Sequence, residues 1–335
     1  MGASFCYNDS YINRDPHPTQ PVNHPVASAL IPVVLLIAVG FLAGKRQWIG
    51  SGSVKDLSSL VFMVLAPALL FRTMATQQNP QVDFKALTIY FGVALVVYFG
   101  VIAALGFSRR SAVLALAATF SNTVMIGVPL VGLAYGEAGL FILFTLISLH
   151  ALVLLTVATI VLEFAVAREQ AVQGQPVTRA AMAATVLGAV RNAVIHPVPL
   201  PIIAGLLFAQ TGLQIPDVID RPLQLLGNSF GPLALVMVGV TMAANPAGAQ
   251  LRGAFMVALA KNVAHPALMA AAGWVLGLRG VPLAVMVIAA SLPIGANVFL
   301  FSQRYQVAQQ VVTASVALST GLGLVSVSLV MLLLG

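Results

Sequence analysis

Long runs of apolar residues constrain the fold of this chain more than any other feature of its sequence. Runs of about 20 apolar residues are long enough to cross the hydrocarbon core of a bilayer as α-helices. Hydrophobic residues make up 59% of the 335 residues and charged residues only 7%, whereas a soluble domain carries about a quarter charged residues. The short alternating segments that are typical of a membrane barrel are not found in the sequence. The sequence therefore predicts an all-α integral membrane protein.

We expect ten transmembrane helices, separated by short polar segments. Their expected bounds are 27–44, 57–76, 84–106, 112–134, 139–164, 197–212, 223–243, 251–277, 281–302 and 308–334. The longest polar interval, 165–195, separates five spans from five. We accordingly expect a disordered N-terminal tail (1–25), a first five-helix repeat (26–166), a cytoplasmic linker (167–190) and a second five-helix repeat (191–335). The tail lacks the basic-then-apolar order of a signal peptide.

The two halves of the chain resemble each other at matching places. His24-Pro25-Val26 opens the first expected span and His196-Pro197-Val198 opens the sixth. Met74-Ala75 and Met242-Ala243 close the second and the seventh. An odd number of spans in each half forces the second half to enter from the opposite side of the bilayer. Inverted repeats of this kind are typical of secondary transporters.

The distribution of Lys and Arg predicts the orientation, because cytoplasmic loops are enriched in these residues. With the N-terminus outside, ten basic residues lie in cytoplasmic segments and five in external ones, which favours both termini outside the cell. The ten are Lys45, Arg46, Lys55, Arg109, Arg110, Arg168, Arg179, Arg191, Arg252 and Arg304. This enrichment explains the net charge of +7, so we do not expect nucleic acid as a partner.

Two of the expected spans carry polar and helix-breaking residues near their middles. Span four contains Ser121-Asn-Thr-Val-Met-Ile-Gly-Val-Pro129, and span nine contains Ser291-Leu-Pro-Ile-Gly-Ala-Asn297. Proline removes a backbone donor and clashes with the preceding turn, so each sequence alone is consistent with an ordinary proline kink capped by asparagine. Two broken helices at corresponding positions, however, are the best sequence indication of a binding site near the middle of the membrane.

The chemistry of such a site follows from the freed backbone groups. A broken helix leaves unpaired N–H groups at the start of its second half, and the helix dipole makes that end positive. Two such ends that meet within the membrane form a site for a carboxylate. To this expected substrate site we assign Asn122, Thr123, Pro129, Pro293 and Asn297.

Lys261 and His150 are two further candidates for substrate binding. Lys261 is the only cation well inside an expected span, and a buried ammonium group needs a partner or a cavity. It either balances the charge of an anionic substrate or extends its apolar stem until its head reaches the interface. His150, in the middle of span five, either donates to the substrate or titrates, or it forms a hydrogen bond to a neighbouring helix. The residues alone leave both pairs of alternatives open.

Signatures of common enzyme classes are missing from the sequence. It contains no His-Glu-x-x-His, no Gly-x-Ser-x-Gly and no Walker loop. The expected spans also offer no pair of carboxylates for acid–base chemistry or for a tight sodium or proton site. The only cysteine, Cys6, cannot form an intrachain disulfide. We predict no enzymatic activity, no cofactor and no metal.

The motif that begins at Asn122 resembles the auxin efflux carrier family, which includes the plant PIN carriers and bacterial permeases for malonate, malate and similar acids. Asn122-Thr-Val-Met-Ile-Gly-Val-Pro-Leu130 is similar to the span-four motif of the family, and Lys261 to Met269 continues the match. Further similar motifs are Gly277-Leu-Arg-Gly280, Leu292-Pro-x-Gly295, Phe299-x-Phe301 and Tyr305-x-Val307. The resemblance covers about residues 26–335.

This resemblance implies a fold and a set of roles. It implies ten helices in two inverted five-helix repeats, as in bile-acid/sodium symporter-like transporters, with broken helices four and nine crossing at the substrate site. Spans one, two, six and seven would form a scaffold and the others a moving transport domain. The resemblance further implies that Asn122 contacts the substrate carboxylate, that His150 takes the place of a substrate-contacting glutamine, and that Lys261 matches a basic position in plant carriers.

The chain also departs from the plant pattern. Tyr90-Phe91-Gly92 stands where plant carriers hold an acidic residue, and Asn297-Val298 replaces an apolar residue and a proline. The long cytosolic loop of many plant members is reduced to about 165–195. These departures argue against auxin as the natural substrate and against plant-type regulation.

Together these features predict a secondary transporter, or permease, for a small mono- or dicarboxylate in the cell (inner) membrane. We expect an elevator-type alternating-access mechanism. The alternatives are a non-transporting membrane receptor or scaffold on the same fold, and a sodium-coupled symporter of the bile-acid type. The expected partners are the carboxylate substrate and the lipid bilayer, while a homodimer, the direction of transport and the coupling ion stay open.

Overall fold

Helices make up the regular secondary structure of the described residues. The computed structural model describes residues 25–77, 82–172, 178–194, 197–244 and 250–334, so the expected tail lies outside them except for Pro25. Short π-helical segments are labelled η. In chain order the helices are α1 (Pro25–Lys45), α2 (Ser51–Leu60), η1 (Val61–Leu65), α3 (Ala66–Ala75), α4 (Phe84–Leu105), α5 (Arg109–Thr119), η2 (Thr123–Gly127), α6 (Val128–Val172), α7 (Arg179–Val194), α8 (Pro199–Gln210), α9 (Asp217–Ala244), α10 (Leu251–Leu259), η3 (Ala260–Ala264), α11 (His265–Val275), α12 (Gly280–Ser291), α13 (Asn297–Arg304) and α14 (Gln309–Leu334).

Seven helical segments within these ranges are long and apolar enough to cross a bilayer. They are Ser28–Lys45, Gly52–Ala75, Phe84–Leu105, Thr123–Ala171, Asp217–Ala244, Leu251–Val275 and Gln309–Leu334. Expected spans six and nine fall on shorter helices, and span four is divided between α5 and the start of the longest segment. The all-α fold class is confirmed, whereas a count of ten depends on how the interrupted helices cross the bilayer.

The longest segment consists of two helices joined at a glycine. Taken as one helix, α6 has 45 residues, which at 1.5 Å per residue would span roughly twice the hydrocarbon thickness. Gly136 interrupts it with φ 58° and ψ −148°, a conformation that glycine adopts without the steric cost of a Cβ atom. This interruption lies between expected spans four and five.

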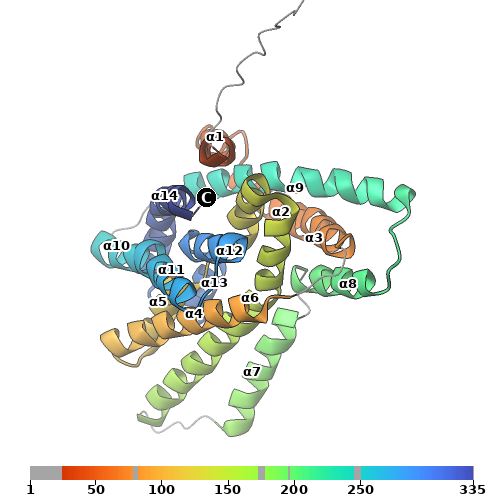
Figure 1. Cartoon of the computed structure of the whole chain (residues 1–335). Coiled ribbons are helices and arrows are strands. Elements are labelled where there is room, and N and C mark those ends of the chain that lie inside the picture. The colour runs from red at the N-terminus through yellow and green to blue at the C-terminus, as the bar shows by residue number, and fades with distance from the viewer. Residues whose placement is uncertain (1–24, 78–81, 173–177, 195–196, 245–249, 335) are drawn as a thin grey trace, which may run out of the picture.

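The expected linker, 167–190, is helical at both ends. α6 continues to Val172 and α7 begins at Arg179, and the sequence of α7 is rich in alanine, the strongest helix former. α7 packs against α6, and Figure 1 shows α7 and the C-terminal part of α6 projecting together from the rest of the protein. The polar residues of this interval therefore lie largely on helices.

The remaining helices pack in two groups (Figure 1). In the first group α1 packs on α9, and α3 packs on both α8 and α9. In the second group α4 packs on α5 and α11, α10 packs on α14, and α12 packs on α6, α11 and α14. The interrupted helices α5 and α12 belong to the second group.

Backbone contact between α1 and α9 depends on two glycines. A Cβ atom on Gly40 would lie 1.9 Å from the carbonyl oxygen of Val236, and one on Gly239 would lie 2.0 Å from that of Ile37. Lipid is as apolar as a leucine side chain, so helices in a bilayer associate through close van der Waals packing at small residues. The two glycines allow α1 and α9 this approach.

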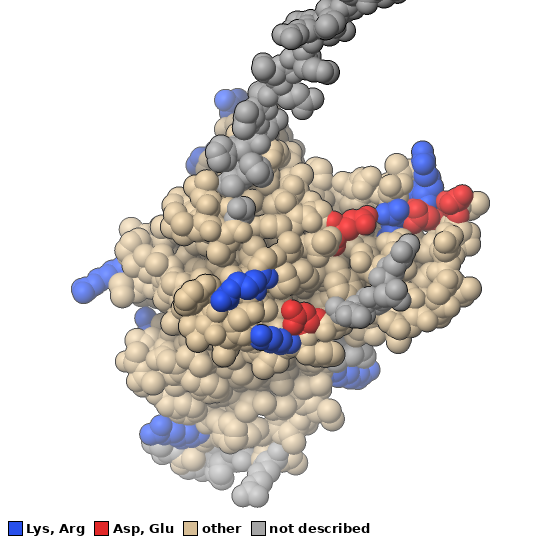
Figure 2. All heavy atoms as spheres, viewed as in Figure 1, with Lys and Arg blue, Asp and Glu red and all other residues tan. Residues whose placement is uncertain are grey.

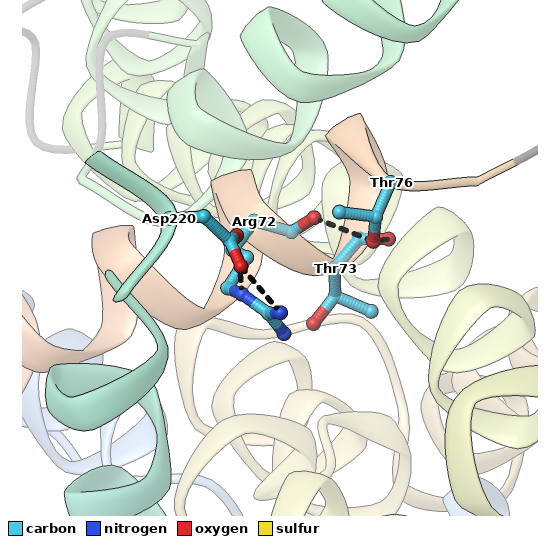
Figure 3. A network of polar contacts seen from close by, with 4 residues as sticks. All are labelled: Arg72, Thr73, Thr76 and Asp220. Carbon is cyan, nitrogen blue, oxygen red and sulfur yellow. Dashed lines mark hydrogen bonds and ion pairs between the residues drawn. The ribbon is translucent and has the colours of Figure 1, made fainter. Parts of the chain in front are cut away.

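An ion pair joins α3 to α9 (Figure 3). Arg72 donates from Nε and Nη2 to the two carboxylate oxygens of Asp220, at 2.7 and 2.9 Å. Each side chain is 24% exposed, so the pair contributes about 1 kcal/mol or less. Its bidentate geometry nevertheless fixes the orientation of the guanidinium group.

The surface of the protein carries few charges. Figure 2 shows scattered Lys, Arg, Asp and Glu side chains on a face formed mostly by other residues. Large apolar side chains are exposed on several helices, among them Leu133, Phe164, Val325 and Leu329. Exposed apolar surface of this extent marks a partner that is itself apolar, and for helices of this length that partner is lipid.

Candidate functional site

The two interrupted helices meet at their breaks. α5 ends at Thr119 and η2 begins at Thr123, while α12 ends at Ser291 and α13 begins at Asn297. Across these gaps Ser121 pairs with Ile294 in an isolated antiparallel bridge. The structure therefore brings together the two polar motifs that the sequence singled out, although they lie far apart in the chain.

Backbone groups freed by one break are satisfied by the other. The N–H of Asn122 donates to the carbonyl of Pro293 at 2.8 Å, and the N–H of Gly295 donates to the carbonyl of Phe120 at 2.9 Å. Irregular backbone survives at membrane depth only where such partners exist or where it lines a water-filled cavity. The crossing is thus a mutually bonded pair of loops.

The second half of each interrupted helix begins at this crossing, as η2 after the first break and as α13 after the second. Asn122 caps η2, since its Oδ1 accepts from the N–H of Met125 at 3.3 Å; its amide Nδ2 is then the donor that can meet an anion. Thr123 is the buried first residue of η2, and Asn297 is the half-buried first residue of α13. Helix starts carry partial positive charge, so each break places such a charge next to the crossing.

The two candidate prolines occupy different places. Pro293 lies in the break, and a Cβ atom on Gly323 of α14 would come within 2.8 Å of its Cγ. Pro129 lies seven residues after Asn122, at the second position of α6, which continues directly from the π-helical segment η2; it therefore lies inside the second half of the interrupted helix and not at its start. A Cβ atom on Gly231 of α9 would lie 3.3 Å from that of Pro129. Pro129 therefore contacts the first helix group, and the break of span four lies upstream of it.

His150 lies directly beside the break. Its side chain is 2% exposed, and its Nε2 accepts a hydrogen bond from the N–H of Ser121 at 3.2 Å. Its ring centroid is 4.6 Å from that of Phe120. The hydrogen bond to a neighbouring element is therefore present, and it is made to the candidate site itself.

Lys261 is fully buried. Its Nζ donates to the carbonyl of Ala290 in the last turn of α12, where the negative end of the helix dipole favours a cation. This contact holds the ammonium group inside the protein. It contradicts the alternative in which the side chain extends to the interface.

Asn262 completes the support of the crossing and was missed by the sequence reasoning. Its Nδ2 donates to the carbonyl of Ser291 at 2.9 Å, and its Oδ1 accepts from Ser319 at 2.6 Å. Ser319 in turn accepts from the N–H of Ile294 at 3.0 Å. The π-helical segment η3 places Lys261 and Asn262, adjacent in sequence, in buried positions. The amide next to a lysine in an apolar span was the available signal.

These contacts define what the site can do chemically. It offers two helix starts, an asparagine amide and a buried ammonium group, which together suit an anion. Among the described residues, no group of three or more His, Cys, Asp and Glu side chains is arranged to hold a metal ion.

Comparison with known proteins gives the following relatives. The profile of the family described as "Membrane transport protein" matches residues 25–331. The chain is 27% identical over 315 residues to a protein named "Putative malonate transporter" from Rhizobium meliloti (strain 1021), covering 90% of this chain and 94% of that protein. It is 23% identical over 231 residues to auxin efflux carrier component 8 of Arabidopsis thaliana, covering 58% and 63% of the two chains. It is 32% identical over 126 residues to auxin efflux carrier component 1 of the same plant, covering 37% and 20%.

Proposed function

The chain belongs to the membrane transport protein family, and we propose that it is a secondary transporter, or permease, for small mono- or dicarboxylates. The family is one of multi-pass membrane transporters and not of enzymes, and its relatives include the auxin efflux carriers. The bacterial relative named as a malonate transporter, which matches nearly end to end, supports a small organic anion as the substrate.

The observation that carries the proposal is the bonded crossing of the two interrupted helices. Phe120–Asn122 and Pro293–Gly295 form it through two backbone hydrogen bonds. A carboxylate would accept from the Nδ2 of Asn122 and from N–H groups in the first turns of η2 and α13, with Thr123, Asn297 and Pro293 shaping the site. His150 and Lys261 support it from α6 and η3.

We propose that the crossing moves during transport. The chain would cross the membrane ten times, as two inverted repeats of five spans (26–166 and 191–335), with Gly136 dividing spans four and five. The group of α1, α3, α8 and α9 would be the static scaffold, and the group that holds the crossing would carry the substrate as an elevator. The packing of α1 on α9 and of α3 on α8 and α9 supports this division.

Uptake by purified protein tests the function. Proteoliposomes should take up labelled malonate faster than protein-free liposomes, and unlabelled malonate should compete. Binding of carboxylates without any uptake would replace the proposal with that of a receptor. Uptake that depends on sodium would replace it with that of a sodium-coupled symporter.

Asn122→Ala is expected to weaken substrate binding. The change removes an amide donor whose loss leaves the anion short of a partner, at a cost of about 1–3 kcal/mol, or roughly five- to 150-fold in affinity. Binding is measured by the shift in melting temperature with malonate. Asn122→Asp is the matched control, because its carboxylate can still accept from the N–H of Met125 but has neither of the two N–H donors of the amide. The fold of this variant should be intact and its anion affinity lost. Wild-type affinity in either variant contradicts the role.

Labelling of single cysteines is expected to place the two ends of α4 on opposite sides of the membrane. Lys85 and Arg110 are both exposed, and about 33 Å of helix at 1.5 Å per residue separates the ends of α4. In a Cys6→Ser background, Lys85→Cys should react with an impermeant maleimide added outside intact cells, and Arg110→Cys should react only after lysis. The reverse pattern contradicts the proposed orientation, in which both termini are external.

A further inference from the structure

Three rings from three different helices meet behind the crossing. The centroid of Tyr90, on α4, is 5.9 Å from that of His150, on α6, and 6.1 Å from that of His265, at the start of α11. Tyr90 and His265 are both 0% exposed. The sequence reasoning gave His265 no role, although it lies in the same buried cluster as Lys261 and His150.

Both histidines have nitrogen atoms without a partner. Neither ring nitrogen of His265 has a hydrogen-bond partner among the described residues, and the same holds for Nδ1 of His150. Buried polar groups in proteins are nearly always paired, so each exception calls for an explanation such as an unseen ligand or a functional role.

The two histidines differ in what a proton would do to them. Nε2 of His150 accepts from the N–H of Ser121, so a neutral His150 carries its hydrogen on Nδ1. Protonation at Nε2 would place a second N–H against the N–H of Ser121. The backbone N–H of Ser121 would then have no acceptor at the break. A neutral His265 also has one nitrogen with a lone pair, but that nitrogen has no bond to lose. His265 can therefore take up a proton without disrupting the crossing.

We propose that His265 is a proton-binding site and that one proton accompanies each substrate anion. This inference rests on the proposed function and adds its coupling ion. A proton needs no cavity beyond the nitrogen lone pair that receives it, so the packed rings around His265 can accommodate it. His150 stabilises the crossing through its hydrogen bond to Ser121, whereas His265 binds the proton that accompanies the anion.

The charges around His265 make proton and anion binding mutually dependent. Its titratable neighbours are Lys261 on η3, His150 on α6 and Tyr90 on α4; α12, which also packs on α11, carries none. Lys85 lies on α4 as well, but at its far end beside Gly277. No Asp or Glu forms an ion pair or hydrogen bond with these groups in the described part of the chain.

A second positive charge beside Lys261 would therefore have no protein counter-charge. A bound carboxylate supplies that counter-charge, so the anion favours the proton and, by the reciprocity of linked binding, the proton favours the anion. The coupled complex carries one negative charge fewer than the anion alone.

A pH gradient across proteoliposomes tests the inference. With the membrane potential clamped by potassium and valinomycin, an inside-alkaline gradient of about one pH unit should raise malonate accumulation up to tenfold for one proton per anion. A trapped pH dye should report acidification inside during uptake. His265→Gln should still exchange labelled for unlabelled malonate, yet lose both the accumulation and the dye signal.

His150→Gln is the matched control. It should lower the rate of uptake, because His150 supports the crossing, but the remaining uptake should still respond to the gradient. If His265→Gln does not fold, calorimetry of malonate binding to the wild type in two buffers of different ionisation heat measures the proton directly. About one proton taken up per anion supports the site.

The outcomes separate this inference from the proposed function. The proton site is overturned if malonate uptake does not change with the pH gradient, the dye signal does not change and no proton is taken up on binding. The proposed transport function would then still stand. A gradient response that persists in His265→Gln overturns the assignment to His265. No uptake by the wild type under any gradient overturns both.

Discussion

Lys261→Met is expected to abolish carboxylate uptake by proteoliposomes, while Lys261→Arg retains it. Methionine keeps the length and the apolar stem of the side chain but removes its charge. If the ammonium group offsets the negative charge of the substrate, the anion in the variant is buried without its partner, at a cost of about 3–5 kcal/mol. That cost corresponds to a loss of roughly 100-fold or more in affinity. The measurements are initial uptake rate at matched protein content and binding of malonate in detergent.

The structure supplies a second explanation that the experiment must separate from the first. Lys261 donates to the carbonyl of Ala290 at the end of α12, so it also caps that helix. Lys261→Gln keeps a neutral donor for this carbonyl and removes only the charge. Loss of binding in both the glutamine and the methionine variants assigns the effect to charge, whereas rescue by glutamine assigns it to capping. A methionine variant that binds normally but does not transport places the charge in the moving step.

The helices of this protein were predictable because their signal is local. Apolar runs of about 20 residues predict spans by length alone. The expected spans fall on described helices, although α2 and α9 begin six residues before the expected bounds and spans four and nine are interrupted. Gly136 fell in an expected loop, and the structure turns there. The polar interval 165–195 separates the two expected repeats, with a cytoplasmic linker expected over 167–190, and α7 within that interval is helical, as its alanine content favours. Polar composition marks exposure and does not exclude a helix.

The candidate site was predictable in part. Ser121–Thr123 and Pro293–Gly295 stood out because polar and helix-breaking residues are costly within a span. Proline alone does not locate the break: Pro293 lies in one, whereas Pro129 lies inside the helix that follows the other, six residues after its first residue Thr123. The partners of the crossing could not be read from the sequence. Asn262 bonds Ser319 across 57 residues, and Tyr90 joins two histidines from other helices, which are contacts that only the packing creates.

Gly295→Val is expected to separate the two loops of the crossing and to remove substrate binding. A Cβ atom at this position would lie 2.7 Å from Cδ1 of Phe120 and 3.1 Å from the carbonyl oxygen of Ser121. The ring of Phe120 cannot yield freely, because the imidazole of His150 packs against it. Relief of the clash would stretch the hydrogen bonds Gly295 N–H to Phe120 and Asn122 N–H to Pro293.

The size of the effect follows from these two losses. The bound state needs the intact crossing, so its free energy rises by about 1–3 kcal/mol through overpacking. The two weakened backbone hydrogen bonds add about 1 kcal/mol each. Together they should reduce malonate affinity and uptake by roughly 100-fold or more. Gly100→Val is the matched control: Gly100 lies on α4, and a Cβ atom there has nothing within 4 Å, so this variant should bind and transport nearly as the wild type does. A folded Gly295→Val protein with wild-type affinity would show that the substrate does not depend on the crossing, and the proposed site would then lie elsewhere.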